Sequence, residues 1–156
     1  MNMTSRTRRL LVFAFVAYLV LLIYGLFLSP YFGRTQGNVH GVNLIPFAEI
    51  KRFYKGPESL ANRLFWLNIV GNIVVFIPLG FFVAMLTRKR LYGALAMAVV
   101  YIASLCAELL QYVFNVGSFD IDDVILNTIG GLIGVLLSIP LKKKAPAKGR
   151  RTGKKK

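Results

Sequence analysis

Residues 10–28 read LLVFAFVAYLVLLIYGLFL, and this stretch decides the class of fold. It holds no charged side chain, and as a helix rising about 1.5 Å per residue it is long enough to cross a hydrocarbon core of about 30 Å. Arg6, Arg8 and Arg9 precede it, as basic residues precede the apolar part of a secretory signal. That part of a signal is only about 7–15 residues long and ends in small residues, whereas this stretch runs on into residues 29–31 (SPY). We therefore predict a retained membrane anchor.

Three further apolar blocks follow, at residues 64–86, 91–114 and 124–141. The composition fits membrane spans, since 56% of the residues are hydrophobic, 17% are charged and the mean hydropathy is +0.59. Soluble domains are about 45–50% apolar and about 25% charged. A β-barrel would need alternating segments of about ten residues, and the sequence shows none. We predict an all-α membrane protein with four transmembrane helices, formed by residues 1–141.

The basic residues predict how the helices cross the membrane. The chain carries 20 Lys and Arg against 6 Asp and Glu, a net charge of +14. Three basic residues precede the first span, three stand at 88–90 and nine lie in the tail 142–156, so 15 of the 20 share one side. Lys and Arg in short loops are retained in the cytoplasm, so we predict that both termini are cytoplasmic. We expect the tail to be disordered and to touch anionic lipid rather than nucleic acid.

The long loop after the first span holds a second predicted element. Phe47, Ile50, Phe53 and Tyr54 lie at nearly helical spacing, with charged residues between them. This pattern is typical of an amphipathic helix on the membrane surface. A partly ordered loop is the alternative.

Polar side chains within the spans are the main indication of function. Counted along the helices, they fall in the outer third of the bilayer, on three different spans. Such side chains face the bundle interior or a wet cavity, so we predict a shared polar site that opens outward. The alternative is that they only hydrogen-bond the helices together, a use worth about 0.6 kcal/mol per contact. The candidate binding residues in the spans and at their ends are Asn68, Asn72, Glu108, Gln111, Asp123 and Asn127.

Asp120 and Asp122 complete the candidate binding set, just before the fourth span. The segment resembles the start of a calcium loop, but Val124 occupies the third ligand position, which argues against an EF-hand. A cation held by Asp120, Asp122 and Glu108 is one alternative, and capping of the fourth helix by Asp120 or Asp122 is another. We predict no metal ion and no cofactor. If the site is catalytic, Glu108 and Asp123 are the candidate acid and base.

The other polar or small residues have simpler interpretations. His40 is the sole histidine and falls in a glycine-containing loop, where we expect it to be solvated. Cys106 is the sole cysteine, so an internal disulfide is excluded, and we expect it to serve packing. Gly130, Gly131 and Gly134 form a small-residue face that allows close helix contact.

Four segments of the chain together resemble the VanZ-like family of bacterial membrane proteins. The segments are 43–47 (NLIPF), 72–80 (NIVVFIPLG), 108–111 (ELLQ) and 119–134 (FDIDDVILNTIGGLIG). The resemblance implies a small multi-spanning protein of the bacterial cytoplasmic membrane, in a family named for low-level teicoplanin resistance. Members often carry an arginine shortly before the Phe-Asp pair, where this chain has Gly117 and Ser118.

The resemblance and the polar residues lead to two functional hypotheses. The first is an envelope protein that is not an enzyme, binds a lipid-linked or surface component and lowers glycopeptide susceptibility. Its expected partners are membrane lipids and a lipid-linked cell-wall component or the glycopeptide itself. The alternative is a membrane enzyme that uses Glu108 and Asp123 on a lipid-linked headgroup. A transporter is disfavoured because the polar groups crowd one leaflet.

Overall fold

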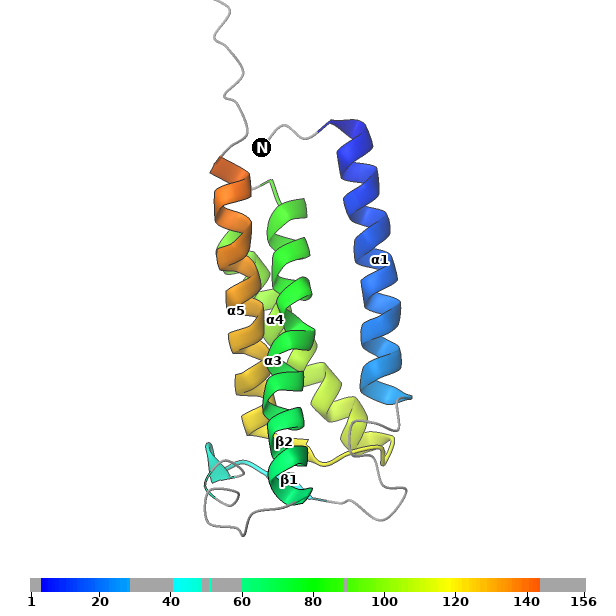
Figure 1. Ribbon diagram of the computed structural model, residues 1–156, viewed down its shortest axis with the longest axis vertical. Coiled ribbons are helices and arrows are strands. Elements are labelled where there is room, and N and C mark those ends of the chain that lie inside the picture. The colour runs from blue at the N-terminus through cyan, green and yellow to red at the C-terminus, as the bar shows by residue number, and fades with distance from the viewer. Residues whose placement is uncertain (1–3, 29–40, 49–50, 52–59, 89, 144–156) are drawn as a thin grey trace, which may run out of the picture.

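The computed structural model describes residues 4–28, 41–48, 51, 60–88 and 90–143 (Figure 1). Within them, four helices are long and apolar enough to cross a membrane. They are α1 (Ser5–Phe27), α3 (Leu60–Leu86), α4 (Tyr92–Val113) and α5 (Ile121–Lys143). Two short strands, β1 (Val42–Asn43) and β2 (Phe119–Asp120), lie at one end of the bundle. The prediction of an all-α protein with four spans is confirmed.

The helix boundaries differ from the predicted spans mostly at their polar ends. α1 begins five residues before the apolar block, because the Oγ1 of Thr4 accepts a hydrogen bond from the Thr7 amide at 3.2 Å and caps the helix. α5 begins at Ile121 and includes Asp122 and Asp123 in its first turn. These extensions keep charged side chains on the helices at the two ends of the bundle, where they can reach the headgroup region.

α3, α4 and α5 pack against one another, and α1 lies on the outside of α3 (Figure 1). A cluster of buried side chains from α1, α3 and α4 joins them, formed by Leu22, Phe76, Leu79 and Val100. Only 6% of the α1 span is buried, against 44% of the α5 span. In a membrane, the exposed face of α1 would contact lipid, where apolar side chains are favoured.

The contact between α3 and α5 is the closest in the bundle, because glycines allow the two backbones to meet. A methyl group on Gly130 would collide with the carbonyl oxygen of Ile73, and one on Gly134 would collide with that of Ile77. This confirms the small-residue face that the sequence predicts.

The two ends of the helix bundle differ in the elements that they contain. The start of α1, the end of α5 and the connection between α3 and α4 occupy one end, while the strands and the starts of α3 and α5 occupy the other (Figure 1). We name the first the basic end, since it includes Arg8, Arg88 and Lys142, and the second the acidic end, since it includes Asp120 and Asp122. The cytoplasmic location of the basic end stays a prediction.

Three predictions fall wholly or mainly outside the described residues. Of the amphipathic segment, Ile50, Phe53 and Tyr54 lie outside them, and so does the tail from residue 144 onward. Lys51 is described, and its amide donates to the Phe47 carbonyl at 3.0 Å. His40 also lies outside the described residues.

Candidate polar site at the acidic end

A two-stranded sheet brings distant parts of the sequence together at the acidic end. β1 and β2 pair in parallel, with Val42 opposite Phe119 and Asn43 opposite Asp120. The amide of Phe119 donates to the carbonyl of Gly41 at 3.0 Å. The sheet therefore fixes the end of the first loop beside the start of α5.

Asp120 is the centre of the buried part of this site. Its Oδ1 accepts one hydrogen bond from the side-chain amide of Asn43 at 3.0 Å and another from the backbone amide of Asp122 at 2.8 Å. The second bond is the cap of α5 that the sequence predicts for Asp120 or Asp122. The backbone amide of Asp120 donates in turn to Oε2 of Glu108 at 3.1 Å. Glu108, on α4, is thereby tied to the start of α5.

Asp122 fastens the loop that follows β1. Its Oδ1 accepts a hydrogen bond from the backbone amide of Phe47. Phe47 has a φ of 64°, a left-handed conformation that is unfavourable for a bulky residue and persists only where its surroundings hold it. Oδ1 of Asn43 also accepts from the amide of Ile45, at 3.2 Å. Carboxylate and amide groups thus hold residues 43–47 against the helices.

The side chains of Glu108, Asp120 and Asp122 are buried, although Glu and Asp are usually exposed. Glu108 and Asp122 are each 3% exposed and Asp120 is 7% exposed. Buried carboxyl groups are tolerated when they accept hydrogen bonds, because an unpaired buried charge is very costly. Each of the three accepts at least one backbone or side-chain amide. The arrangement accounts for their burial and favours a structural role for this part of the site.

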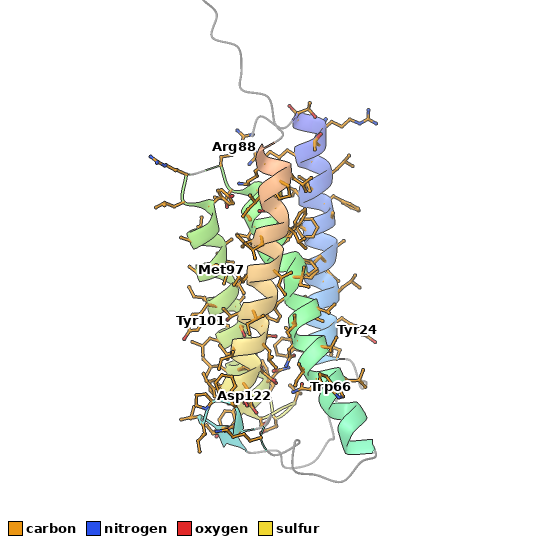
Figure 2. All side chains as sticks on the ribbon, turned by 60° about the vertical axis from the view of Figure 1, so that its left-hand side comes forward. Tyr24, Trp66, Arg88, Met97, Tyr101 and Asp122 are labelled. Atoms are coloured by element: carbon orange, nitrogen blue, oxygen red, sulfur yellow. The ribbon has the colours of Figure 1, made fainter. Side chains whose placement is uncertain are left out.

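A second, more open part of the site lies between α3 and α5. The side-chain amide of Asn68 donates to Oδ1 of Asp123 at 3.1 Å, and that of Asn72 donates to Oδ1 of Asn68 at 3.4 Å. Asn68 is exposed, while Asn72 and Asp123 are half-buried. We call these three residues the open polar row. Figure 2 shows the neighbouring residues Trp66, on α3, and Asp122, on α5, at the same end of the bundle.

Two predicted site residues lie apart from both groups. The side-chain amide of Gln111 donates to the carbonyl of Leu26 at 3.0 Å, which ties α4 to the end of α1. Asn127 is 1% exposed and donates to Oγ of Ser104 at 2.9 Å, one turn further into the bundle than Asp123. Among the described residues, no group of three or more His, Cys, Asp and Glu side chains is arranged to hold a metal ion.

The comparisons with known proteins agree with the sequence motifs. The model of the VanZ/LLP1 family matches residues 15–142. The chain is also 32% identical to Protein VanZ of Enterococcus faecium over 123 residues, which cover 77% of this chain and 68% of that protein. This chain belongs to the VanZ/LLP1 family. It is a multi-pass membrane protein, and its family is associated with teicoplanin resistance. No solved structure matches it.

The four segments that resemble VanZ-like proteins supply most of the site in this VanZ/LLP1 chain, while Asn68 of the open polar row lies outside them. Residues 43–47 form the fastened loop, and 72–80 begin with an asparagine of the open polar row. Glu108 opens the third segment, and the fourth starts on β2 and continues into α5. Gly117 and Ser118 stand just before the Phe-Asp pair, where the resemblance implies an arginine. In this chain, the described partner of Glu108 is the Asp120 backbone.

Sequence reasoning left two polar residues of this VanZ/LLP1 protein out of the predicted site. Asn43 donates to Asp120 and accepts from Ile45, and Ser104 accepts from Asn127. Asn43 is the first residue of the first family-like segment, and this position could have indicated that it belongs to the site. Ser104 stands four residues before Glu108, so both lie on one helix face. Serine is common at helix contacts in membranes, so the presence of a serine at 104 does not by itself predict a place in the site.

Proposed function

We propose that this protein is a non-enzymatic envelope factor of the bacterial cytoplasmic membrane. In this proposal the acidic end faces outward, binds a lipid-linked cell-wall component and lowers susceptibility to teicoplanin. The outward direction is supported by the 15 of 20 basic residues that would lie on the opposite side. The resistance outcome is supported by membership of the VanZ/LLP1 family.

The observation that carries the proposal is the open polar row of Asn68, Asn72 and Asp123. It stands at the edge of the bundle between α3 and α5, with Asn68 exposed. Amide groups both donate and accept hydrogen bonds, and a carboxylate accepts several. Such a row suits a headgroup rich in hydroxyl and amide groups, as in sugars and peptides. A lipid-linked ligand can approach this end of the bundle sideways from the bilayer, because the early turns of α3 present exposed apolar side chains, including Trp66 and Leu67.

The buried acids support the row without being needed for chemistry. Asp120, Asp122 and Glu108 hold the loop and the start of α5, and these elements place Asp123 beside Asn68. A preorganised site of this kind loses less free energy on binding than a mobile one.

The alternative is an enzyme that uses Glu108 and Asp123 as acid and base. A general acid or base must come within hydrogen-bond reach of the proton that it moves. Glu108 is 3% exposed and one of its oxygens accepts the Asp120 amide, so a headgroup at the open polar row has little access to it. This geometry favours binding over acid-base catalysis.

The test is teicoplanin susceptibility at matched protein abundance in the membrane. The double variant Asn68→Ala/Asp123→Ala should lose most of the protection, because deleting a hydrogen bond to a charged group weakens binding roughly tenfold or more. Val70→Ala, on the same helix and similarly exposed, is the matched control and should keep it. Mass spectrometry of the purified protein should find a lipid-linked component with the original chain and with Val70→Ala, and much less with the double variant.

Glu108→Gln separates binding from catalysis. The Gln side chain can still accept the Asp120 amide but has no titratable group. For a binder, this variant should keep most of the protection, and its loss at unchanged abundance would favour the enzyme. Full protection in Asn68→Ala/Asp123→Ala would contradict both proposals for this site.

A further inference from the structure

A groove at the basic end carries a separate indication of binding. It has a volume of about 570 Å³ and lies along the first turns of α1, facing the end of α3. Small-molecule sites commonly have volumes of about 300–1,000 Å³. Its walls combine the three arginines Arg8, Arg9 and Arg88 with three apolar side chains, Val12, Phe13 and Val16. Figure 2 shows Arg88 at the end of the bundle opposite Asp122.

Aromatic contacts join α1 to α3 next to the groove. The rings of Phe15 and Phe82 lie 5.6 Å apart, and those of Tyr18 and Phe82 lie 6.0 Å apart. The hydroxyl of Tyr18 also donates to the carbonyl of Val75 at 2.8 Å. Nearer the start of α1, side chains face outward, and Phe13 is 75% exposed. The aromatic contact thus marks where the two helices come together beyond the groove.

The charge of the groove is of one sign. No acidic side chain among the described residues lines it, and residues 4–28 and 86–92 contain no Asp or Glu. The acids that the structure describes all lie at the acidic end, namely Glu108, Asp120, Asp122 and Asp123. Arginine presents a planar set of donors that matches phosphate oxygens in pairs. Basic pockets between transmembrane helices are typical sites for anionic lipid headgroups.

We propose that this groove binds one anionic phospholipid from the leaflet on the side of the chain termini. Its phosphodiester is held by Arg8, Arg9 and Arg88, and one acyl chain lies along Val12, Phe13 and Val16. The apolar wall distinguishes this ligand from a free phosphate ion, which has the same anionic chemistry but no chain to bury. The bound lipid fills the space between α1 and α3 and joins the two helices at this end. This site is independent of the function proposed for the acidic end.

The experiment is native mass spectrometry of the full chain with phosphatidylglycerol, and with phosphatidylcholine as the zwitterionic comparison. The original protein should retain one phosphatidylglycerol in preference to phosphatidylcholine. Arg8→Gln/Arg88→Gln should reduce that retention roughly tenfold, because each basic residue near an anionic lipid contributes a severalfold attraction. Arg8→Lys/Arg88→Lys keeps the charge and the inside signal, and should fall between the two.

The matched control is Arg6→Gln/Arg90→Gln. It removes the same charge from the same two segments, but neither residue lines the groove. The two double variants should therefore have equal effects on topology and on general attraction to anionic lipid. Circular dichroism checks that all variants have the same helical content. Equal loss of lipid in both pairs would overturn the site.

A second arm separates a lipid from a free anion. Phe13→Ala should weaken phosphatidylglycerol retention, whereas Leu21→Ala, another exposed position on α1, should not. Excess inorganic phosphate should leave the lipid in place. Displacement by phosphate together with unchanged binding in Phe13→Ala would overturn the assignment to a lipid.

Discussion

The two ends of the bundle accommodate charge in opposite ways. At the acidic end, carboxyl groups are buried and accept hydrogen bonds from amides of the loop and of α5. At the basic end, arginines line an open groove, and the ammonium of Lys142 lies 3.7 Å from the Tyr92 ring centre while donating to the Thr87 carbonyl at 2.7 Å. Short acidic side chains can be enclosed by backbone donors, whereas long basic ones keep their charge at the surface.

The difference in charge coincides with a difference in packing. α5, which starts at the acidic end, meets α3 through glycines, while only 6% of the α1 span is buried. We therefore expect substitutions at the glycine contact and at the buried acids to be costly. Substitutions on α1 should be mild.

The largest effect should come from adding methyl groups at the contact of α3 with α5. Gly130→Ala/Gly134→Ala places two methyl groups against the carbonyl oxygens of Ile73 and Ile77, and overpacking costs about 1–3 kcal/mol per site. Gly25→Ala is the matched control on α1, because a methyl group there meets nothing within 4 Å. Alanine favours a helix over glycine by about 1 kcal/mol, so the control should be neutral or slightly more stable. Thermal unfolding in detergent measures both, and equal stabilities would remove the contrast in packing.

A smaller effect should follow from deleting the carboxylate that holds the loop. Asp122→Ala leaves the Phe47 amide without its acceptor, at a cost of about 1–3 kcal/mol. Asp122→Asn keeps an acceptor oxygen and should cost less. Amide hydrogen exchange should be faster at residues 43–47 in the Ala variant, and unchanged in the first turns of α1. Equal protection of the loop in the Ala variant and the original protein would show that Asp122 does not hold it.

The fold was predictable because its main determinants are local in sequence. A continuous apolar block predicts a membrane-spanning helix without any knowledge of the helices that pack against it. All four helices were therefore predicted, including α1 from the apolar block at residues 10–28. The glycine face of α5 was also predictable, since Gly130 and Gly134 are four residues apart. The position of α1 against α3 was not, because an apolar helix in lipid has no polar face to show which side packs.

The candidate site was predictable in its residue types and less so in its pairings. Spacing along single helices placed Glu108 and Asp123 at one depth, and the cap by Asp120 was anticipated. The pairing of Asn43 with Asp120 joins residues 77 positions apart through the strands, and no local pattern indicates such a distance. The groove of Arg8 and Arg88 likewise depends on how the start of α1 lies beside the end of α3. These residues are far apart in the sequence, where they indicate only topology.

The smallest predicted effect concerns a polar pair between the two ends of the bundle. This pair is neither fully hydrogen-bonded, like the buried acids, nor open to the surface, like the arginines. Asn127 donates to Ser104, but its Oδ1 is buried and accepts no hydrogen bond from the described residues. Ser104→Ala should be destabilising, because it leaves the Asn127 amide without its acceptor as well. Interhelical hydrogen bonds in membranes contribute about 0.6 kcal/mol on average, so the coupling in a double-mutant cycle should be of that order. In Ser104→Ala/Asn127→Leu both partners become apolar with nearly the same shape, and stability in detergent should return to that of the original protein or exceed it. A double variant less stable than Ser104→Ala alone would contradict this expectation. It would mean that Oδ1 of Asn127 accepts a hydrogen bond in the membrane, so that Asn127 stabilises the bundle as the buried acids do at the acidic end.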